Sequence, residues 1–365
     1  MNKNFIVKID ERRFVDIVKV LPRRFKDGKR VVYKNFPNGM IKIYIKKAPG
    51  RGGHDSKKFI LNRFIKLDKL FFEGLGLWEG EAGKSKGLYF GNSCPELLLH
   101  FLKFVGQKLG LVREQFKVTV NSPNLNKPED FINKRWSEKL RIPFENFTHV
   151  CYDPRINQEY AQVYINGIVL SELMKNLHEK LKSIILINKE YIVSYLRGVF
   201  AAEGSVILKP SGVIFKIDFS TIDMKWVDFL SKSLHYLGIR AGVYVSGGKK
   251  FQIYGRENLE KVKEFKLYDL HPDKKTKFED GISKYQRFVV PGHIMEKLIL
   301  QQLLLSGPKT YDEISFALKK GRSTIQSHYI PILEKKEFVK KVGKRRVAWL
   351  FGITEEGINF LKKST

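Results

Sequence analysis

Two stretches of the chain share one design: Phe72-Glu73-Gly74-Leu75-Gly76-Leu77-Trp78-Glu79-Gly80 and Leu196-Arg197-Gly198-Val199-Phe200-Ala201-Ala202-Glu203-Gly204. In each stretch one Gly precedes a second Gly by six residues, and a Glu stands directly before the second Gly. Each stretch lies at the carboxyl end of an apolar run with helical periodicity. Two similar motifs separated by one structural unit indicate an internal duplication.

The elements predicted around the two motifs support a duplication. Apolar periodicity and turn residues predict helix, strand, strand, helix, strand, strand and helix over residues 63–185, and the same order again over residues 186–288. In the second copy, the strand-like segments Ala241–Val245 and Phe251–Tyr254 form a hairpin that turns at Gly247-Gly248. We therefore predict an α+β fold built as a pseudo-two-fold duplicated αββαββα domain.

The glycines and acids of the motifs suggest a common site. Glycine within a helix costs about 1 kcal/mol relative to alanine, which is tolerable where bare backbone lets a second helix approach closely. We therefore predict that Gly74 and Gly198 lie in a helix–helix interface, which brings Glu79 and Glu203 together at the helix ends. Two adjacent carboxylates repel each other unless a cation lies between them, and oxygen ligands suit Mg²⁺ or a related divalent cation such as Mn²⁺. Such an ion activates water and stabilises the leaving oxygen of a phosphodiester.

The charge of the chain points to a polyanionic partner. The formal net charge is +29 over 365 residues, and lysine and arginine gain affinity for nucleic acid by releasing condensed counterions. An anionic membrane surface is the competing partner, but the sequence contains no apolar run of about 18 residues. The two cysteines and eight scattered histidines show no zinc-site spacing. We expect a reducing interior and oxygen ligands for any metal.

The duplicated region is flanked by two further predicted modules. Residues 1–62 are rich in lysine and arginine, with β-like runs at Phe5–Val7, Val31–Tyr33 and Met40–Tyr44, and predict a basic β-rich module. Residues 289–365 predict three helices, a hairpin and a last helix, an order that resembles a winged helix-turn-helix domain. Its second and third helices would begin at Tyr311, after the capping residue Thr310, and at Ser323, with Pro331 kinking the third.

The residues expected to contact DNA in this last module fall into two groups. The start of the third helix is the part that usually meets base edges, and the hairpin is suited to phosphate contact. The first group is Arg322, Ser323 and Gln326, and the second is Lys344, Arg345 and Arg346.

The two motifs resemble those of the LAGLIDADG homing endonucleases in their single-chain, two-motif form, over roughly residues 63 to 285. The resemblance implies a saddle of two four-stranded antiparallel sheets on the DNA major groove. It also implies metal-dependent cleavage of both strands of a long site, which leaves short 3′ overhangs. By the same resemblance, Glu79 and Glu203 match the metal-binding acids. The position two residues before each acid, usually Asp in the family, holds Leu77 in one copy and Ala201 in the other.

The resemblance also implies basic residues near the scissile phosphates and along the groove. Lys249 or Lys250 takes the catalytic place by its position after the second motif. The groove-facing candidates on the second copy are Lys209, Lys216, Arg240 and Lys250.

Other functions fit the same pattern. The WhiA proteins, a family of bacterial sporulation regulators, join a LAGLIDADG-like domain to a C-terminal helix-turn-helix and lack nuclease activity. Some LAGLIDADG proteins assist intron splicing as RNA maturases, so RNA is the alternative nucleic acid. The retained Glu79 and Glu203 favour a nuclease. The motif residues of an intein's ends are missing, which predicts a free-standing or intron-encoded enzyme. We expect a cytoplasmic, nucleoid-associated monomer, and the Lys- and Ile-rich composition is compatible with a thermophile.

Overall fold

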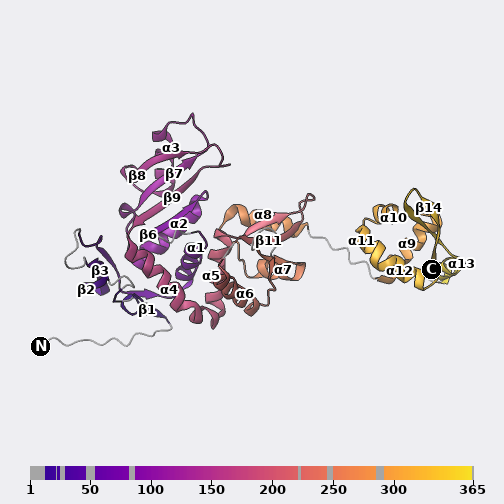
Figure 1. Ribbon diagram of the computed structural model, residues 1–365, viewed down its shortest axis with the longest axis horizontal. Helices are drawn as coiled ribbons and strands as arrows, with labels where there is room; N and C mark the ends of the chain where they lie inside the picture. Colours follow the sequence, from indigo (N-terminus) through magenta and orange to yellow (C-terminus); the bar gives the residue numbers. More distant parts are fainter. Residues whose placement is uncertain are drawn as a thin grey trace. The chain divides into compact units, whose positions relative to one another are not determined.

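The computed structural model describes residues 13–21, 23–24, 29–46, 54–81, 87–220, 223–244, 250–284 and 292–363. The chain divides into two compact units, residues 1–285 and 286–365, each with its own apolar core. Figure 1 shows the elements of both units. Within the described part of the chain, no helix has the length and apolar character needed to cross a membrane.

The first unit begins with small antiparallel sheets. Strand β1 (Phe14–Asp16) pairs with β5 (Phe64–Lys66), and β2 (Arg30–Asn35), β3 (Met40–Lys46) and β4 (Phe59–Asn62) form a three-stranded sheet in the order β2-β3-β4. The β2–β3 connection turns at Asn38 and Gly39, both of which have positive φ, as tight hairpins of this kind require. The predicted strand at Phe5–Val7 lies outside the described residues.

The next part of the unit departs from the predicted element order. Its elements are α1 (Lys69–Glu81), β6 (Gly87–Asn92), α2 (Pro95–Phe104), β7 (Lys117–Ser122), α3 (Glu129–Leu140), β8 (Phe147–Tyr152), β9 (Tyr160–Asn166) and α4 (Ile168–Leu186). Only one strand separates α1 from α2, so the predicted αββαββα order is wrong for this copy. The residue pattern of Val150–Tyr152 and Gln162–Ile165 predicts a hairpin between these two strands. The sheet order is instead β6-β9-β7-β8, and β8 pairs with β7 in parallel. A parallel pair needs a long crossover, and α3 supplies it.

The second copy follows the predicted order. Its elements are α5 (Lys189–Ala202), β10 (Ser205–Leu208), β11 (Ile214–Ser220), α6 (Met224–Tyr236), β12 (Gly242–Tyr244), β13 (Lys250–Tyr254) and α7 (Arg256–Glu264), followed by α8 (Pro272–Ser283). The four strands form an antiparallel sheet in the order β10-β11-β13-β12. The duplication is therefore strongest at the helices α1 and α5 and weaker in the two sheets.

The second unit contains α9 (Gly292–Ser306), α10 (Tyr311–Ala317), α11 (Arg322–Thr324), α12 (Ile330–Lys335), the hairpin β14 (Val339–Arg345) and β15 (Ala348–Ile353), and α13 (Glu355–Lys363). Thr310 caps α10 and Glu313 completes the capping box, as the spacing predicts. A π-helical turn, Ile325–Tyr329, joins α11 to α12. Pro331 is the second residue of α12, and because proline has no backbone N–H, the helical hydrogen-bond pattern must change there.

Candidate functional site

The centre of the first unit is the packing of α1 against α5 along small residues. A Cβ atom built on Gly76 would lie 2.2 Å from the carbonyl oxygen of Tyr195, and one on Gly198 would lie 2.1 Å from that of Glu73. One turn further, a Cβ on Gly80 would lie 2.6 Å from the Cβ of Ala202. None of these distances leaves room for a larger side chain. The two helices therefore touch through their backbones, and their carboxyl ends must meet.

This contact corrects the alignment of the first motif. Gly198 lies in the interface, but Gly74 faces the ring of Phe104 in α2, where a Cβ would lie 2.0 Å from Cγ. Gly76 takes the interface place that the sequence analysis assigned to Gly74. The first motif therefore shifts by two residues relative to the second. Glu203, at the end of α5, is the fifth residue after Gly198, and Glu81, the last residue of α1, is the fifth residue after Gly76. Glu81 is therefore the counterpart of Glu203.

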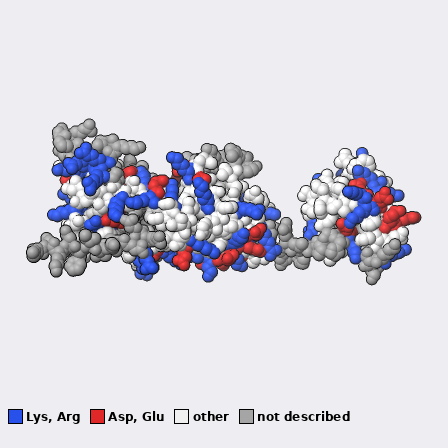
Figure 2. Space-filling view, turned by 90° about the horizontal axis from the view of Figure 1, so that it is seen from below, with Lys and Arg blue, Asp and Glu red and all other residues white. Residues whose placement is uncertain are grey.

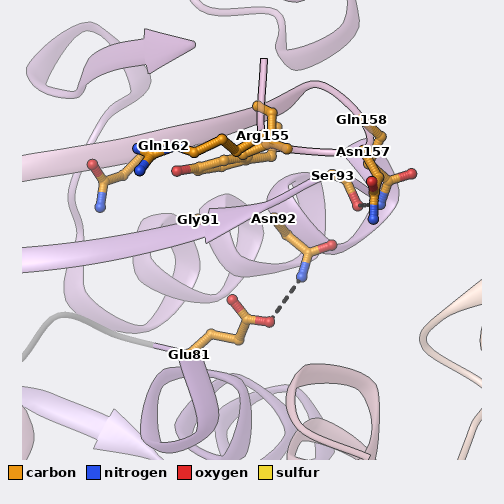
Figure 3. Close-up of a pocket in the computed structure, with 10 residues that line it drawn as sticks. Glu81, Gly91, Asn92, Ser93, Arg155, Asn157, Gln158 and Gln162 are labelled. Atoms are coloured by element: carbon orange, nitrogen blue, oxygen red, sulfur yellow. Dashed lines mark hydrogen bonds between the residues drawn. The ribbon is translucent and has the colours of Figure 1, made fainter. Parts of the chain in front are cut away.

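Glu81 lies beside Glu203 at the end of α1. Burial, followed by the charge of Glu203, raises the pKa of Glu81 from 4.5 to about 7. The amide of Asn92, at the end of β6, donates a hydrogen bond of 3.2 Å to Oε1 of Glu81, and Figure 3 shows these two side chains pointing toward each other. Two carboxylates near enough for one charge to raise the pKa of the other favour either a shared proton or a cation.

The protein places a cation of its own at this point. Lys274, in the first turn of α8, donates from Nζ to the carbonyl oxygens of Ala201 and Ala202, at 2.7 and 2.8 Å. These carbonyls belong to the last turn of α5, where the helix dipole is negative. Burial lowers the pKa of Lys274 to about 8, against the opposing charges of Glu81 and Glu203. Nothing in the sequence around Lys274 predicts this contact, because the two motifs lie far from it along the chain.

The acid pair fits a divalent cation of the Mg²⁺ type. Two carboxylates at two converging helix ends supply anionic oxygen ligands, and Mg²⁺ takes its remaining ligands from water and phosphate oxygens. Among the residues that the structure describes, no group of three or more His, Cys, Asp or Glu side chains is arranged to hold a metal. Glu81 and Glu203 would hold the ion together with water and substrate.

Glu79, which the sequence predicts to bind the metal, lies in different surroundings from Glu81. Its Oε2 lies 3.3 Å from Nδ1 of His178 in α4, and Nε2 of His178 lies 3.0 Å from the hydroxyl of Tyr195. The indole of Trp226 donates to the same hydroxyl at 3.0 Å. Burial and then the charge of Glu79 raise the pKa of Tyr195 well above its usual range. Glu79 therefore belongs to a buried polar network that joins α1, α4, α5 and α6, whereas Glu81 is the acid of α1 whose pKa is raised by the charge of Glu203.

A polar hollow of about 570 Å³ opens beside Glu81 (Figure 3). Its lining side chains come from the end of β6, the β8–β9 connection and β9, and they carry amide, hydroxyl and guanidinium groups: Asn92, Ser93, Arg155, Asn157, Gln158, Tyr160 and Gln162. Gln158 donates to the Ser93 hydroxyl at 2.7 Å, which ties the β8–β9 connection to β6. The sequence predicts none of these residues as part of a site, because the only pattern they show is a local excess of amide side chains around residue 157.

The predicted groove residues of the second copy lie in varied settings. Lys216 on β11 pairs with Asp218 at 3.2 Å, so its charge is partly neutralised. Lys209 lies over the ring of Phe215 at 5.6 Å. Arg240 is exposed and precedes β12. Lys249 and the side chain of Lys250 lie outside the described residues, so their predicted catalytic place stays a prediction.

In the second unit, the predicted DNA-contacting side chains are exposed. Arg322 pairs with Asp312 at 3.0 Å, which links the start of α11 to α10. Arg345, the last residue of β14, pairs with Glu313 and links the turn end of the hairpin to α10. Lys344 lies 4.3 Å from the centre of the Trp349 ring. Ser323 and Gln326 extend from α11 and the π-helical turn, and Arg346 lies at the hairpin turn with φ of 56°. Exposed ion pairs of this kind contribute at most about 1 kcal/mol, so a phosphate can replace the acidic partner.

Residues 190–265 match the model of a LAGLIDADG-like domain. The match covers α5 to α7, the copy that keeps the αββαββα order.

Among solved structures, I-DmoI in complex with DNA and Mn is similar at 12% identity and a TM-score of 0.35, over 55% of this chain and 97% of that one. Full-length DUF199/WhiA from Thermatoga maritima is similar at 13% identity and a TM-score of 0.31, over 74% of this chain and 91% of that one. No curated protein matches the chain.

Proposed function

We propose that this protein is a site-specific endonuclease that cuts double-stranded DNA with the help of a divalent cation held by Glu81 and Glu203. The observation that carries the proposal is the convergence of these two glutamates at the ends of α1 and α5, where glycine packing forces the helix ends together. The match of residues 190–265 to a LAGLIDADG-like domain and the net charge of +29 support DNA as the substrate. We also propose a saddle-like DNA surface formed by the two four-stranded sheets, and a winged helix in the second unit.

Each residue of the site has its own part in DNA cleavage. When bound, Mg²⁺ or Mn²⁺ would polarise the scissile phosphate and lower the pKa of water. Glu81 must lose its proton to bind the cation, and Asn92 holds its carboxylate in place. Lys274 keeps the last turn of α5 in position, and thereby Glu203, which caps that helix. The polar hollow beside Glu81 supplies amide groups suited to base edges and phosphates.

One observation favours a second candidate, a DNA-binding regulator without nuclease activity. Lys274 already places an ammonium group near both acids, so the pair is partly neutralised without a metal. A chain that uses Lys274 in this way would keep the fold and the DNA affinity and need no cation.

Plasmid cleavage with a library of random sites, in Mg²⁺ and in EDTA, separates the two candidates. Mg²⁺-dependent cutting at a long site, lost in Glu81→Gln and in Glu203→Gln with DNA affinity retained, supports the endonuclease. Glu264→Gln, an exposed acid at the end of α7, is the matched control and should cut normally. Tight, specific binding without cutting in any divalent metal would instead establish the regulator.

A further inference from the structure

The N-terminal sheet has one apolar face and one basic face. Along β3, Ile41, Ile43 and Ile45 are buried, and the alternate residues point to the other side. The ring of Phe59, on β4, packs against Gly167 just before α4, where a Cβ would lie 2.6 Å away. The apolar face therefore belongs to the core of the first unit, and the opposite face is turned to solvent.

The solvent-turned face carries five cations around a short apolar row. Its residues are Arg30, Lys34, Lys42, Lys46 and Lys58, around Val32, Tyr44 and Ile60. The Nζ of Lys58 lies 5.4 Å from the centre of the Tyr44 ring, which confirms that the two share this face. We call this set the N-terminal basic face. Figure 2 shows lysine and arginine side chains gathered at the left, where Figure 1 places β2 and β3.

The strand register sets like charges directly opposite one another. Arg30 is the cross-strand partner of Lys46, and Lys34 is the partner of Lys42. Like charges in this position destabilise an antiparallel pair. Among the described residues, none of these four cations has an acidic partner within ion-pair distance. The sheet thus carries a repulsion that an external anion would relieve.

The spacing of the cations favours an extended polyanion over a small ion. They lie along two neighbouring strands, which are 4.7–4.9 Å apart, and alternate residues on one strand repeat about every 6.8 Å. A single phosphate cannot contact all of them, whereas the phosphates of a duplex can. Tyr44 at the centre adds an aromatic surface that tolerates sugar contact.

We propose that the N-terminal basic face binds the sugar-phosphate backbone of double-stranded DNA, and so extends the DNA contact beyond the LAGLIDADG-like domain. The inference rests on the proposed function, because it takes duplex DNA as the substrate of the whole chain. It assigns to this face affinity and positioning without sequence readout.

The test compares two triple variants of the full chain that remove the same charge. Lys34→Gln, Lys42→Gln and Lys46→Gln together remove three cations of the face. Lys225→Gln, Lys263→Gln and Lys277→Gln together remove three exposed lysines from α6, α7 and α8. Fluorescence anisotropy with a 40-base-pair duplex of random sequence, in EDTA, gives the binding constant at several salt concentrations. The slope of log K against log salt is negative, and each phosphate contact contributes about −0.9 to it. The loss of three phosphate contacts should therefore make the slope less steep by about 2.7.

The expected result is a shallower slope and an affinity lower by at least tenfold for the face variant, with little change in the control. Replacing the same three lysines with arginine should restore the slope. The face variant should melt no lower than the unmodified chain, since it relieves like-charge pairs, which separates loss of contact from loss of fold.

Three results would overturn the inference. If the unmodified chain binds duplex DNA and the face variant keeps its slope, this inference fails alone. A slope change seen with single-stranded RNA and not with duplex DNA assigns the face to another ligand. If the unmodified chain binds no duplex DNA at any salt concentration, the inference fails together with the proposed function.

Discussion

Replacing Glu81 with glutamine should stabilise the protein above neutral pH while it abolishes cleavage. The folded-state pKa of about 7 lies above the ordinary 4.5 of a glutamate, so the folded protein binds this proton more tightly than the unfolded chain does. The stability that this proton contributes is complete below pH 4.5 and is lost as the pH rises through about 7. Glutamine keeps the shape of the protonated acid and avoids that loss.

The size of the effect follows from the pKa shift. Each pKa unit corresponds to about 1.4 kcal/mol, so the shift sets an upper bound of about 3 kcal/mol at pH 8.5. Glu81 borders an open hollow and is only partly buried, and solvent screening lowers the expected gain to about 1–2 kcal/mol. For a unit of this size, each kcal/mol raises the melting temperature by roughly 2–4 °C.

Calorimetry of the full chain in EDTA at pH 5 and pH 8.5 measures this gain. The melting temperature of Glu81→Gln should exceed that of the unmodified protein at pH 8.5 and approach it at pH 5, whereas Glu264→Gln should differ little at either pH. Mg²⁺ should raise the melting temperature of the unmodified protein more than that of the variant, because a ligand that binds only the folded state stabilises it. An equal shift at both pH values, or cleavage by Glu81→Gln, would refute the reasoning.

Three further changes probe the rest of the site. Glu79→Ala removes the partner of buried His178 and should lower the free energy of unfolding by about 1–3 kcal/mol in urea denaturation. The folded variant should still cleave DNA below its melting temperature. Complete loss of cleavage by a folded Glu79→Ala would instead assign the metal to Glu79. Gly198→Ala forces a methyl group against the backbone of α1 and should lower the free energy of unfolding by about 3 kcal/mol or more. Gly242→Ala is the control, because nothing lies within 4 Å of the new Cβ, and it should melt at nearly the temperature of the unmodified chain. Equal melting temperatures for the two variants would contradict the close helix contact. Lys274→Met leaves the carbonyls of Ala201 and Ala202 without their ammonium partner and should destabilise the metal-free protein by roughly 1–3 kcal/mol. Mg²⁺ should recover part of this loss in a thermal-shift assay. If the variant melts in EDTA at the same temperature as the unmodified chain, Lys274 does not stabilise the end of α5.

The second motif could be read correctly from the sequence because it is nearly regular. Gly198 and Glu203 stand in an apolar helix whose N-cap, Asn188, is also evident from its residue type. The first motif contains three glycines within seven residues, Gly74, Gly76 and Gly80, so two registers fit the spacing equally well. Only the packing partners decide between them: Phe104 fills the space over Gly74, and the α5 backbone lies over Gly76.

Element type and order followed from periodicity wherever contacts are local. The cap at Thr310 and the β12–β13 hairpin are such cases. The parallel pairing of β7 with β8 could not be predicted, because strand partners are chosen by sheet contacts far apart in the chain. The same limit applies to the polar hollow, whose residues come from separate segments around Glu81.

The sequence by itself determined the duplicated glycine-and-acid design, the position of Glu203 at the end of its helix, and a charge suited to a polyanion. These features depend on residue type and on spacing within one helix. The tertiary structure alone decided that Glu81 is the partner of Glu203, that Glu79 binds His178, and that Lys274 reaches the end of α5. Each of these depends on which backbone faces which across a helix pair, and a shift of two residues there rotates an acid from the site into the core.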